Sequence, residues 1–230
     1  MSCCGWCGTV VTPPISVSRL LTFDTHPDKL CTLCRNKMIV LSSCKRCSEC
    51  CRIVQEITVC SDCLMWRSLY PKLSSGHTAL YAYNERAKDI MTAFKLKGDC
   101  ELAYLFSDDI RRALKIFPAN TCFVPVPSAE ESLSIRGFNP VELLLEAAGV
   151  NYDKALTASR DTGRQAKKNR KERLRTRQPF TLCPKRSKAI ADKPVVIVDD
   201  VYTTGRTLYH ALEAISPCQP SSLQTFSLFR

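Results

Sequence analysis

The later two-thirds of the chain alternate strand-like and helix-like hydrophobic patterns. Residues 78–83 alternate apolar with polar positions, as a half-buried strand does. One face of a helix is predicted next by four apolar residues at helical spacing, which are Ala87, Ile90, Met91 and Phe94. Strands that alternate with helices are typical of an α/β domain built on a mostly parallel sheet.

A second helix and two further strands extend this pattern. The helix is predicted by six apolar residues that keep helical spacing, which are Leu102, Leu105, Phe106, Ile110, Ala113 and Leu114. Pro118 ends it, and residues 121–126 then have the pattern of a strand. A turn at residues 217–220 precedes a final strand predicted over residues 223–229.

A further helix start is predicted at Asn139. Asn139 can act as the N-cap, Pro140 suits the first helical position and Glu142 can reach back toward the cap. Gly149 is a natural stop for this helix. Residues 136–138 precede the cap and either place an arginine near an anion or form a plain structured turn. Both interpretations remain open.

The strongest strand signal is followed directly by two acids. Residues 195–198 are consecutive apolar residues, nearly all β-branched, which favours a strand buried on both faces of a sheet. We expect the strand to end there, with Asp199 and Asp200 at its carboxyl end, where open α/β sheets bind ligands. Adjacent carboxylates at such a place can accept hydrogen bonds from vicinal sugar hydroxyls or hold Mg²⁺.

A hydroxyl-rich loop with one glycine comes next. Its residues can offer an anion hydroxyls, a guanidinium and successive backbone N–H groups. They are Thr203, Thr204, Gly205, Arg206 and Thr207. Apolar residues at helical spacing from Leu208 onward predict a helix whose N-terminus, the positive end of its dipole, faces that anion. An ordinary strand-to-helix turn is the alternative, but it needs neither two acids nor three threonines around one glycine.

Cysteines dominate the first part of the chain, where apolar periodicity is weak. Eleven of the 15 cysteines lie in the first 63 residues. They include four Cys-x-x-Cys pairs, which are Cys4/Cys7, Cys31/Cys34, Cys44/Cys47 and Cys60/Cys63. Two residues between cysteines let one tight turn aim both sulfurs at one ion, and two such pairs complete a tetrahedral zinc site. We therefore predict a zinc-ribbon-like module over residues 1–75 and an α/β domain over residues 76–230.

These pairs can bind one or two ions. We expect consecutive pairs to share an ion, with Cys4, Cys7, Cys31 and Cys34 in one site and Cys44, Cys47, Cys60 and Cys63 in the other. A crossed arrangement remains open, and Cys50 forms a further Cys-x-x-Cys pair with Cys47. Because the segment has little apolar periodicity, we expect the metal to supply folding energy and its role to be structural.

The sequence shows neither an export signal nor an apolar run of membrane-spanning length. We therefore expect the protein in the reducing cytosol, where clustered cysteines act as metal thiolates rather than as a disulfide framework. A peripheral position at the inner face of the membrane remains open. Three isolated histidines, to which we assign neither metal binding nor catalysis, are His26, His77 and His210.

Positive charge is concentrated in one short segment. Although the chain as a whole has an ordinary globular composition, its formal net charge is +11. Residues 160–177 contain nine basic residues against Asp161 and Glu172, with no aromatic residue among them. Candidate contacts for a nucleic-acid backbone are Lys167, Lys168, Arg170, Lys171 and Arg173. A solvated basic loop is the alternative, and the nearly neutral remainder of the chain favours binding of a polyanion.

Residues 195–208 resemble the phosphoribosyl-pyrophosphate motif of type I phosphoribosyltransferases. Together with the cysteine-rich N-terminus and residues 136–139, they make the whole chain similar to the ComF/GntX family of late-competence, phosphoribosyltransferase-like proteins. The resemblance implies that Asp199 and Asp200 bind ribose hydroxyls and that residues 203–207 bind the 5′-phosphate. It also implies that the basic segment corresponds to the loop that closes over the pyrophosphate.

Two functions follow from this resemblance. The first is a cytosolic competence factor for DNA uptake during natural transformation, which binds single-stranded DNA through the basic segment and works with partners such as a competence helicase or ATPase. The alternative is an active phosphoribosyltransferase that uses phosphoribosyl pyrophosphate and Mg²⁺ with an unknown acceptor. No base-recognition hood is recognisable, so the sequence leaves open whether the protein is an enzyme, and we assign no catalytic residue.

Overall fold

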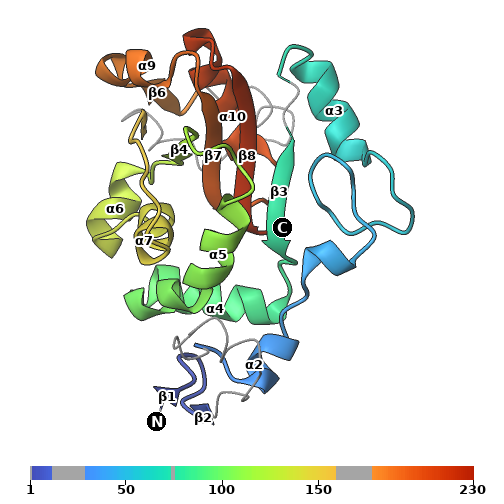
Figure 1. The fold of residues 1–230 in the computed structure, drawn as a ribbon, viewed down its shortest axis with the longest axis vertical. Coiled ribbons are helices and arrows are strands. Elements are labelled where there is room, and N and C mark those ends of the chain that lie inside the picture. Colours follow the sequence, from blue (N-terminus) through green and yellow to red (C-terminus); the bar gives the residue numbers. More distant parts are fainter. Residues whose placement is uncertain (1, 12–28, 74–75, 159–177) are drawn as a thin grey trace.

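A parallel sheet lies at the centre of the protein (Figure 1). The computed structural model describes residues 2–11, 29–73, 76–158 and 178–230. Within these ranges the sheet has four strands, β3 (His77–Tyr81), β4 (Cys122–Pro125), β7 (Pro194–Val201) and β8 (Ser222–Phe229). Their order is β3-β8-β7-β4, and each neighbouring pair is parallel. The mostly parallel α/β sheet predicted from the sequence is confirmed.

The strand β7 is buried on both faces. Val196 and Val198 pack into one hydrophobic cluster, together with the helices of the middle of the chain. Val195 and Ile197 belong to a second cluster, together with the last helix. Successive side chains of a strand point to opposite faces, so an unbroken apolar run serves two cores at once. This two-sided burial confirms the prediction made from residues 195–198.

One face of the sheet is covered by helices from the middle of the chain. They are α4 (Glu85–Leu96), the 3₁₀-helix η2 (Cys100–Phe106), α5 (Ser107–Leu114) and α7 (Pro140–Ala147). The four residues that predicted one face of α4 are all buried. Asn139 caps α7 as predicted, since its side chain accepts a hydrogen bond from Val141 N–H at 3.0 Å.

The single helix predicted over residues 102–114 is divided into η2 and α5. At the junction, the Ser107 hydroxyl donates to the Tyr104 carbonyl oxygen at 3.0 Å. Such a side-chain bond to the preceding turn competes with the regular backbone pattern of a helix. Leu105, Ile110 and most of the other residues that marked the pattern are still buried.

The other face is covered by the helix α10 (Arg206–Ile215), which confirms the helix predicted from Leu208. Nearby elements are the 3₁₀-helix η4 (Ser216–Cys218), the antiparallel ribbon of β5 (Leu156–Ala158) and β6 (Phe180–Leu182), and α9 (Pro184–Ile190). The ribbon, α9 and α6 (Glu130–Arg136) were not predicted. They are short, and α6 has no buried residue that could give it an apolar pattern.

The cysteine-rich segments lie at two separate places (Figure 1). The first place contains the small ribbon of β1 (Ser2–Cys3) and β2 (Val10–Val11) and the helix α2 (Thr32–Asn36), close to α4. The second place contains α3 (Ser61–Leu69), which lies next to β3 on the side away from β8. The 3₁₀-helix η1 (Leu41–Ser43) lies between α2 and α3 in the sequence. The predicted domain boundary at residue 75 stays a prediction.

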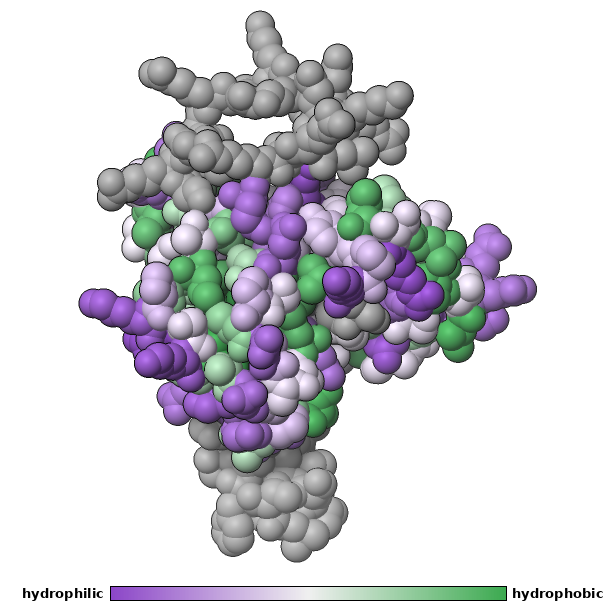
Figure 2. Space-filling model, turned by 90° about the horizontal axis from the view of Figure 1, so that it is seen from above, coloured by the Kyte–Doolittle hydropathy of each residue, from purple (hydrophilic) through white to green (hydrophobic). Residues whose placement is uncertain are grey.

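Hydrophobic side chains reach the surface near α3. Figure 2 shows hydrophobic surface on the lobe at the right of the view, the side on which Figure 1 places α3. Ile57, Leu64 and Leu69 are 74%, 54% and 52% exposed. No helix in the described part of the chain combines the length and the apolar character needed to cross a membrane.

Candidate functional site

Two acids occupy the carboxyl end of β7. The prediction that the strand ends at Val198 is wrong, because β7 stays paired with β8 as far as Val201, which lies opposite Phe229. Asp199 and Asp200 are therefore strand residues, and their side chains leave the sheet on opposite faces. The acids still stand at the edge of the sheet where α/β proteins bind ligands.

The charge of Asp200 is balanced by Lys95 from α4. Lys95 Nζ lies 2.6 Å from Asp200 Oδ2, and the Asp200 side chain is only 7% exposed. The Asp200 backbone N–H donates to Asp199 Oδ1 at 2.9 Å. Burial, reinforced by the negative charge of Asp200, raises the pKa of Asp199 to about 7, although Lys95 opposes this shift. At neutral pH the two acids therefore carry less negative charge than two free carboxylates.

The loop after β7 offers a row of backbone donors. Thr203, Thr204 and Gly205 lead into α10, whose N-terminus has no side-chain cap. Among the described residues, the N–H groups of these three have no hydrogen-bond partner. Adjacent N–H groups at the N-terminus of a helix form a favourable place for an anion.

Gly205 is required by both its conformation and its surroundings. Its φ is 87°, in the left-handed region where a side chain is strained. A Cβ at this position would lie 2.8 Å from Tyr202 Cζ and 3.1 Å from Trp66 Nε1. The loop is therefore shaped against two aromatic side chains, one of which comes from the cysteine-rich part of the chain.

The end of β4 lies beside the end of β7. Val126 N–H donates to the Val198 carbonyl oxygen at 2.9 Å, which brings the segment after β4 next to the acids. Farther along, Arg136 Nε donates to the Lys95 carbonyl oxygen at 3.0 Å, and its guanidinium lies 5.9 Å from the centre of the Phe138 ring. These contacts fit the structured-turn interpretation of Arg136, and its contact with an anion stays a prediction.

The first cysteine cluster joins the four residues that the sequence assigned to one site. They are Cys4, Cys7, Cys31 and Cys34, and their sulfurs all lie within 4.8 Å of one another. Cys7 Sγ and Cys31 Sγ are 3.7 Å apart. Cys7 is exposed, whereas the other three cysteines are buried. The geometry of this cluster therefore agrees with the prediction that two consecutive Cys-x-x-Cys pairs share one ion.

The second cysteine cluster differs from the predicted set in one member. Its residues are Cys47, Cys50, Cys60 and Cys63, with all four sulfurs within 4.8 Å of one another. Cys44 lies outside it, with its thiol 3.5 Å from the Val40 carbonyl oxygen. Cys50 joins instead because it shares a tight turn with Cys47, closed by a 2.7 Å hydrogen bond from Cys47 N–H to the Arg52 carbonyl. The structure thus corrects Cys44 to Cys50.

Both clusters fit a tetrahedral thiolate site for a metal ion. Four sulfurs at about 2.3 Å from a zinc ion would lie about 3.8 Å apart. In the second cluster, Cys47 Sγ lies 3.8 Å from Cys63 Sγ, and Cys50 Sγ lies 3.6 Å from Cys60 Sγ. Cys60 N–H also donates to Cys47 Sγ at 3.3 Å, and contacts of this kind orient metal ligands. The two sets can therefore each hold one metal ion.

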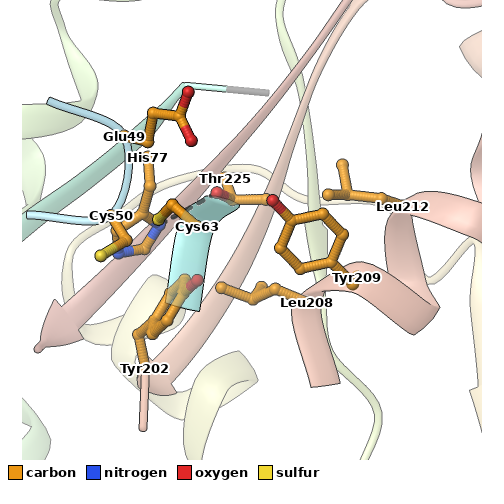
Figure 3. A pocket seen from close by; sticks show the side chains of 9 residues that line it. All are labelled: Glu49, Cys50, Cys63, His77, Tyr202, Leu208, Tyr209, Leu212 and Thr225. Atoms are coloured by element: carbon orange, nitrogen blue, oxygen red, sulfur yellow. Dashed lines mark hydrogen bonds between the residues drawn. The ribbon is translucent and has the colours of Figure 1, made fainter. Parts of the chain in front are cut away.

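A small pocket lies between the second cluster and α10 (Figure 3). Its lining includes Cys50, Cys63, Tyr202 and Tyr209. On its floor His77 lies 2.9 Å from Thr225 Oγ1 and 3.1 Å from Ser227 Oγ. Burial lowers the pKa of His77 to about 3, so this ring is neutral at physiological pH. Through these contacts His77 joins β3 to β8.

The structure brings the predicted ribose and phosphate residues together at one end of β7. The predicted nucleic-acid contacts, in contrast, lie outside the described residues and stay a prediction; they are Lys167, Lys168, Arg170, Lys171 and Arg173.

Three residues of the site were not predicted from the sequence. They are Lys95, which meets Asp200, and Trp66 and Arg230, which contact the loop after β7. Each is far in sequence from its partner, and no local spacing signals such a contact. The one signal in the sequence is chemical, because an acid pair at a buried strand end requires a nearby cation.

A family model for the phosphoribosyl transferase domain matches residues 137–230, so this part of the chain is a phosphoribosyltransferase domain. That match contains β7, the acid pair, the loop and α10. The solved structure of the allosteric regulatory enzyme of purine biosynthesis covers 54% of this chain and 25% of its own, with a TM-score of 0.35 and 19% identity. A likeness this weak supports no conclusion about the protein.

Two curated relatives identify the family more closely. Competence protein ComFC of Streptococcus pneumoniae (strain ATCC BAA-255 / R6) is 30% identical over 227 residues, which cover 99% of both chains. Competence protein ComFC of Bacillus subtilis (strain 168) is 29% identical over 214 residues, covering 90% of this chain and 87% of the relative. The chain belongs to the ComFC family of competence proteins.

Proposed function

We propose that the α/β domain binds phosphoribosyl pyrophosphate, or a related ribose 5-phosphate, at the carboxyl end of β7. The observation that carries this proposal is the row of N–H groups at Thr203, Thr204 and Gly205, for which the described residues supply no partner. Asp199 and Asp200 lie immediately before this loop in β7. A ligand with a phosphate next to a ribose has the two kinds of group that such a site can bind.

Each part of the site has its own task in this proposal. The hydroxyls of Thr203, Thr204 and Thr207 and the Arg206 guanidinium add donors around the 5′-phosphate. The acid pair accepts hydrogen bonds from the ribose hydroxyls. Lys95 offsets one negative charge and so weakens the repulsion between the acids and an anionic ligand. Mg²⁺, when bound with the ligand, would neutralise charge on the pyrophosphate oxygens.

Calorimetry with phosphoribosyl pyrophosphate, with and without Mg²⁺, tests this site. We expect binding that weakens by at least about tenfold when Asp199 and Asp200 are both changed to Asn, since two hydrogen bonds to charged acceptors are lost. The variant Asp89→Asn, an exposed acid on α4, is the control and should bind as the wild type does. Absence of binding, or equal binding by the double variant, contradicts the proposal.

The two cysteine clusters are proposed to hold one zinc ion each. The support is the set of four sulfur donors at each place and the sulfur–sulfur distances near those of a tetrahedral site. Zinc would tie together loops that have little hydrophobic core of their own, so its role is structural. Elemental analysis of the purified protein should find about two zinc ions per chain on this proposal.

The biological role proposed for the protein is that of a cytosolic competence factor that handles single-stranded DNA during natural transformation. Its family membership supports a competence-related role. The DNA contact is proposed for the basic segment, residues 160–177, which has nine basic residues against two acidic ones. Proteins of the uptake machinery, such as a helicase or ATPase, are proposed as partners.

Salt dependence tests the DNA contact. Affinity for single-stranded DNA should fall steeply with salt, and five alanines should weaken it and flatten the slope. The positions to change are Lys167, Lys168, Arg170, Lys171 and Arg173. A matched control neutralises five lysines exposed elsewhere on the described surface, which are Lys72, Lys115, Lys185, Lys188 and Lys193. Equal weakening by both sets would place the DNA on some other surface.

An active phosphoribosyltransferase is the alternative to a protein that only binds its ligand. The same acid pair and loop support it, because such chemistry depends on holding and neutralising the pyrophosphate. Its acceptor is unknown. Release of pyrophosphate in the presence of a panel of nucleobases, measured against the Asp199→Asn plus Asp200→Asn variant, distinguishes turnover from binding.

A further inference from the structure

Three consecutive carbonyl groups of the loop after β7 accept hydrogen bonds from distant side chains. Arg230 Nη1 donates to the carbonyl oxygens of Tyr202 and Thr203, at 3.2 and 3.0 Å. Trp66 Nε1 donates to the carbonyl oxygen of Thr204 at 2.8 Å. Each peptide group from Tyr202 to Gly205 therefore has its oxygen fixed by a side chain from a distant part of the chain.

These contacts determine where the N–H groups of the loop point. In a planar trans peptide, the carbonyl of one residue and the N–H of the next point in opposite directions. Holding the oxygens of Tyr202, Thr203 and Thr204 against Arg230 and Trp66 therefore turns the N–H groups of Thr203, Thr204 and Gly205 away from these two side chains. Those N–H groups are the donors proposed to bind the phosphate. Trp66 and Arg230 therefore orient the anion-binding groups without contacting the anion themselves.

Both donors are tied to the second cysteine cluster. Trp66 follows Cys63 by one turn of α3, and its ring stacks on Tyr209 of α10 with centroids 4.6 Å apart and planes 13° apart. Arg230 Nε donates to the Cys50 carbonyl oxygen at 2.8 Å, and its Nη2 lies 3.1 Å from Cys50 Sγ. Trp66 is 5% exposed, so its N–H has little access to water as an alternative partner.

The Arg230 guanidinium is held in place by a second contact. It lies 4.3 Å from the centre of the Tyr202 ring, a cation–π distance. The same arginine also pairs through its backbone, because its N–H donates to the Tyr81 carbonyl oxygen at 2.8 Å. Arg230 thus joins β3, the second cluster and the loop in one set of contacts.

The first cysteine cluster has no comparable connection within the described residues. Cys4, Cys31 and Cys34 share their hydrophobic cluster with α4, η2 and α5. The second cluster shares its own with Trp66, Tyr202 and α10.

We propose that Trp66 and Arg230 are positioning residues that couple the second cysteine cluster to the phosphate loop, so that metal in this cluster strengthens binding of the phosphorylated ribose. This inference rests on the phosphate site proposed above. By linkage the effect is reciprocal, and a bound ligand raises the affinity of the second cluster for its metal by the same factor. The first cluster does not take part in this coupling.

Two conservative variants and two matched controls test the coupling. Trp66→Phe keeps an aromatic ring on Tyr209 but has no N–H, and Arg230→Lys keeps the charge but loses the planar fork. Calorimetry with phosphoribosyl pyrophosphate should show affinity about tenfold weaker in each, because a loop carbonyl loses the side-chain donor that orients its peptide group. The controls near the first cluster are Trp6→Phe and Arg35→Lys, which should stay within about threefold of the wild type. Equal weakening by the controls overturns the proposal.

A second readout needs no ligand. Hydrogen exchange, followed by mass spectrometry, can report on the two hydrogen-bonded amides that flank the loop, Tyr202 N–H to the Phe229 carbonyl and Tyr209 N–H to the Gly205 carbonyl. The peptide that contains both should exchange faster in Trp66→Phe and Arg230→Lys than in the wild type. Chelating the metal should accelerate the same peptide in a variant that has only the second cluster, Cys31→Ser plus Cys34→Ser. In the reverse variant, Cys60→Ser plus Cys63→Ser, chelation of the first cluster should leave the peptide unchanged.

The two readouts separate the coupling from the phosphate site itself. If the wild type binds no phosphoribosyl pyrophosphate, the proposed function fails and exchange alone decides the coupling. Faster exchange in both variants then supports positioning of the loop, and unchanged exchange overturns it. If the wild type binds and the two variants bind equally well, the coupling fails while the proposed function stands.

Discussion

The two cysteine clusters have the same donors and similar spacing, yet the fold gives them different neighbours. The first packs against α4, η2 and α5 at one end of the molecule and keeps one cysteine, Cys7, exposed. The second is buried at all four cysteines and packs with Tyr202 and α10 beside the candidate ligand site. A metal-binding motif therefore has a role that depends on what its loops contact, because four thiolates alone have no further specificity.

The two clusters also differ in the neighbouring side chains that connect them to the rest of the protein. Arg35, next to the first cluster, contacts Asp109 of α5 at 3.4 Å, which joins two structural elements. Trp66 and Arg230, next to the second cluster, donate hydrogen bonds to carbonyl oxygens of the loop after β7. We therefore expect damage to the first cluster to reduce stability, and damage to the second to affect both stability and ligand binding.

The largest effect is expected from removing each cluster in turn. Cys60→Ser plus Cys63→Ser should lose one zinc ion and weaken binding of phosphoribosyl pyrophosphate by more than about tenfold. Cys31→Ser plus Cys34→Ser should also lose one zinc ion but change the affinity by less than about threefold. Metal content, thermal unfolding and calorimetry check this pair of variants. Equal loss of affinity in both would break the contrast between the clusters.

A pair of glycines allows a milder comparison of the same two regions. Gly205→Ala should reduce the free energy of unfolding by about 3 kcal/mol, because the new Cβ is strained at a φ of 87° and meets Tyr202 and Trp66. Gly8→Ala, near the first cluster, has a φ of 71° but nothing within 4 Å, so about 1 kcal/mol is expected. Urea unfolding measures both. A similar loss for the two would contradict the packing of Trp66 and Tyr202 against the loop.

The contact between Lys95 and Asp200 involves neither cluster, so a variant of it shows what damage to the ligand site does when both clusters are intact. Lys95→Met leaves a buried carboxylate without its cation and should reduce the free energy of unfolding by about 2 kcal/mol, a value lowered because Lys95 is partly exposed. Metal content should stay unchanged. The exposed neighbour Lys97→Met is the control, with an expected change below about 0.5 kcal/mol in urea unfolding.

The titration of Asp199 gives a further test that involves neither cluster. Its pKa is raised to about 7 in the folded protein, well above its ordinary value of 3.8, so the folded state holds the proton more tightly than the unfolded state. The stability that this adds is present at low pH and is lost as pH rises from about 4 to about 7. Asp199→Asn should therefore gain in stability relative to the wild type between pH 4 and 7, with unchanged metal content.

Unfolding midpoints of the two proteins at several pH values test this titration. Asp89→Asn, which changes an exposed acid, serves as the control. A constant difference between wild type and Asp199→Asn across this range would show that Asp199 is ionised throughout.

Local patterns in the sequence determine much of this fold. The unbroken apolar run at residues 195–198 predicts a strand buried on two faces, and both faces are filled. The capping residues at Asn139 and the apolar face of α4 are predicted equally well, because helix and strand periods are short-range properties. The candidate phosphate loop is recognisable for the same reason, since all its residues are contiguous in the sequence.

Contacts between distant segments could be decided only by the tertiary structure. Cys44 and Cys50 are each separated from Cys47 by two residues, so spacing alone could not distinguish them, and the turn closed by Arg52 selected Cys50. Pairing with β8 carried β7 past its expected end. Trp66, Lys95 and Arg230 reached the site because helices and strands brought them there, and a one-dimensional pattern contains no information about which side chain meets which backbone group across the fold.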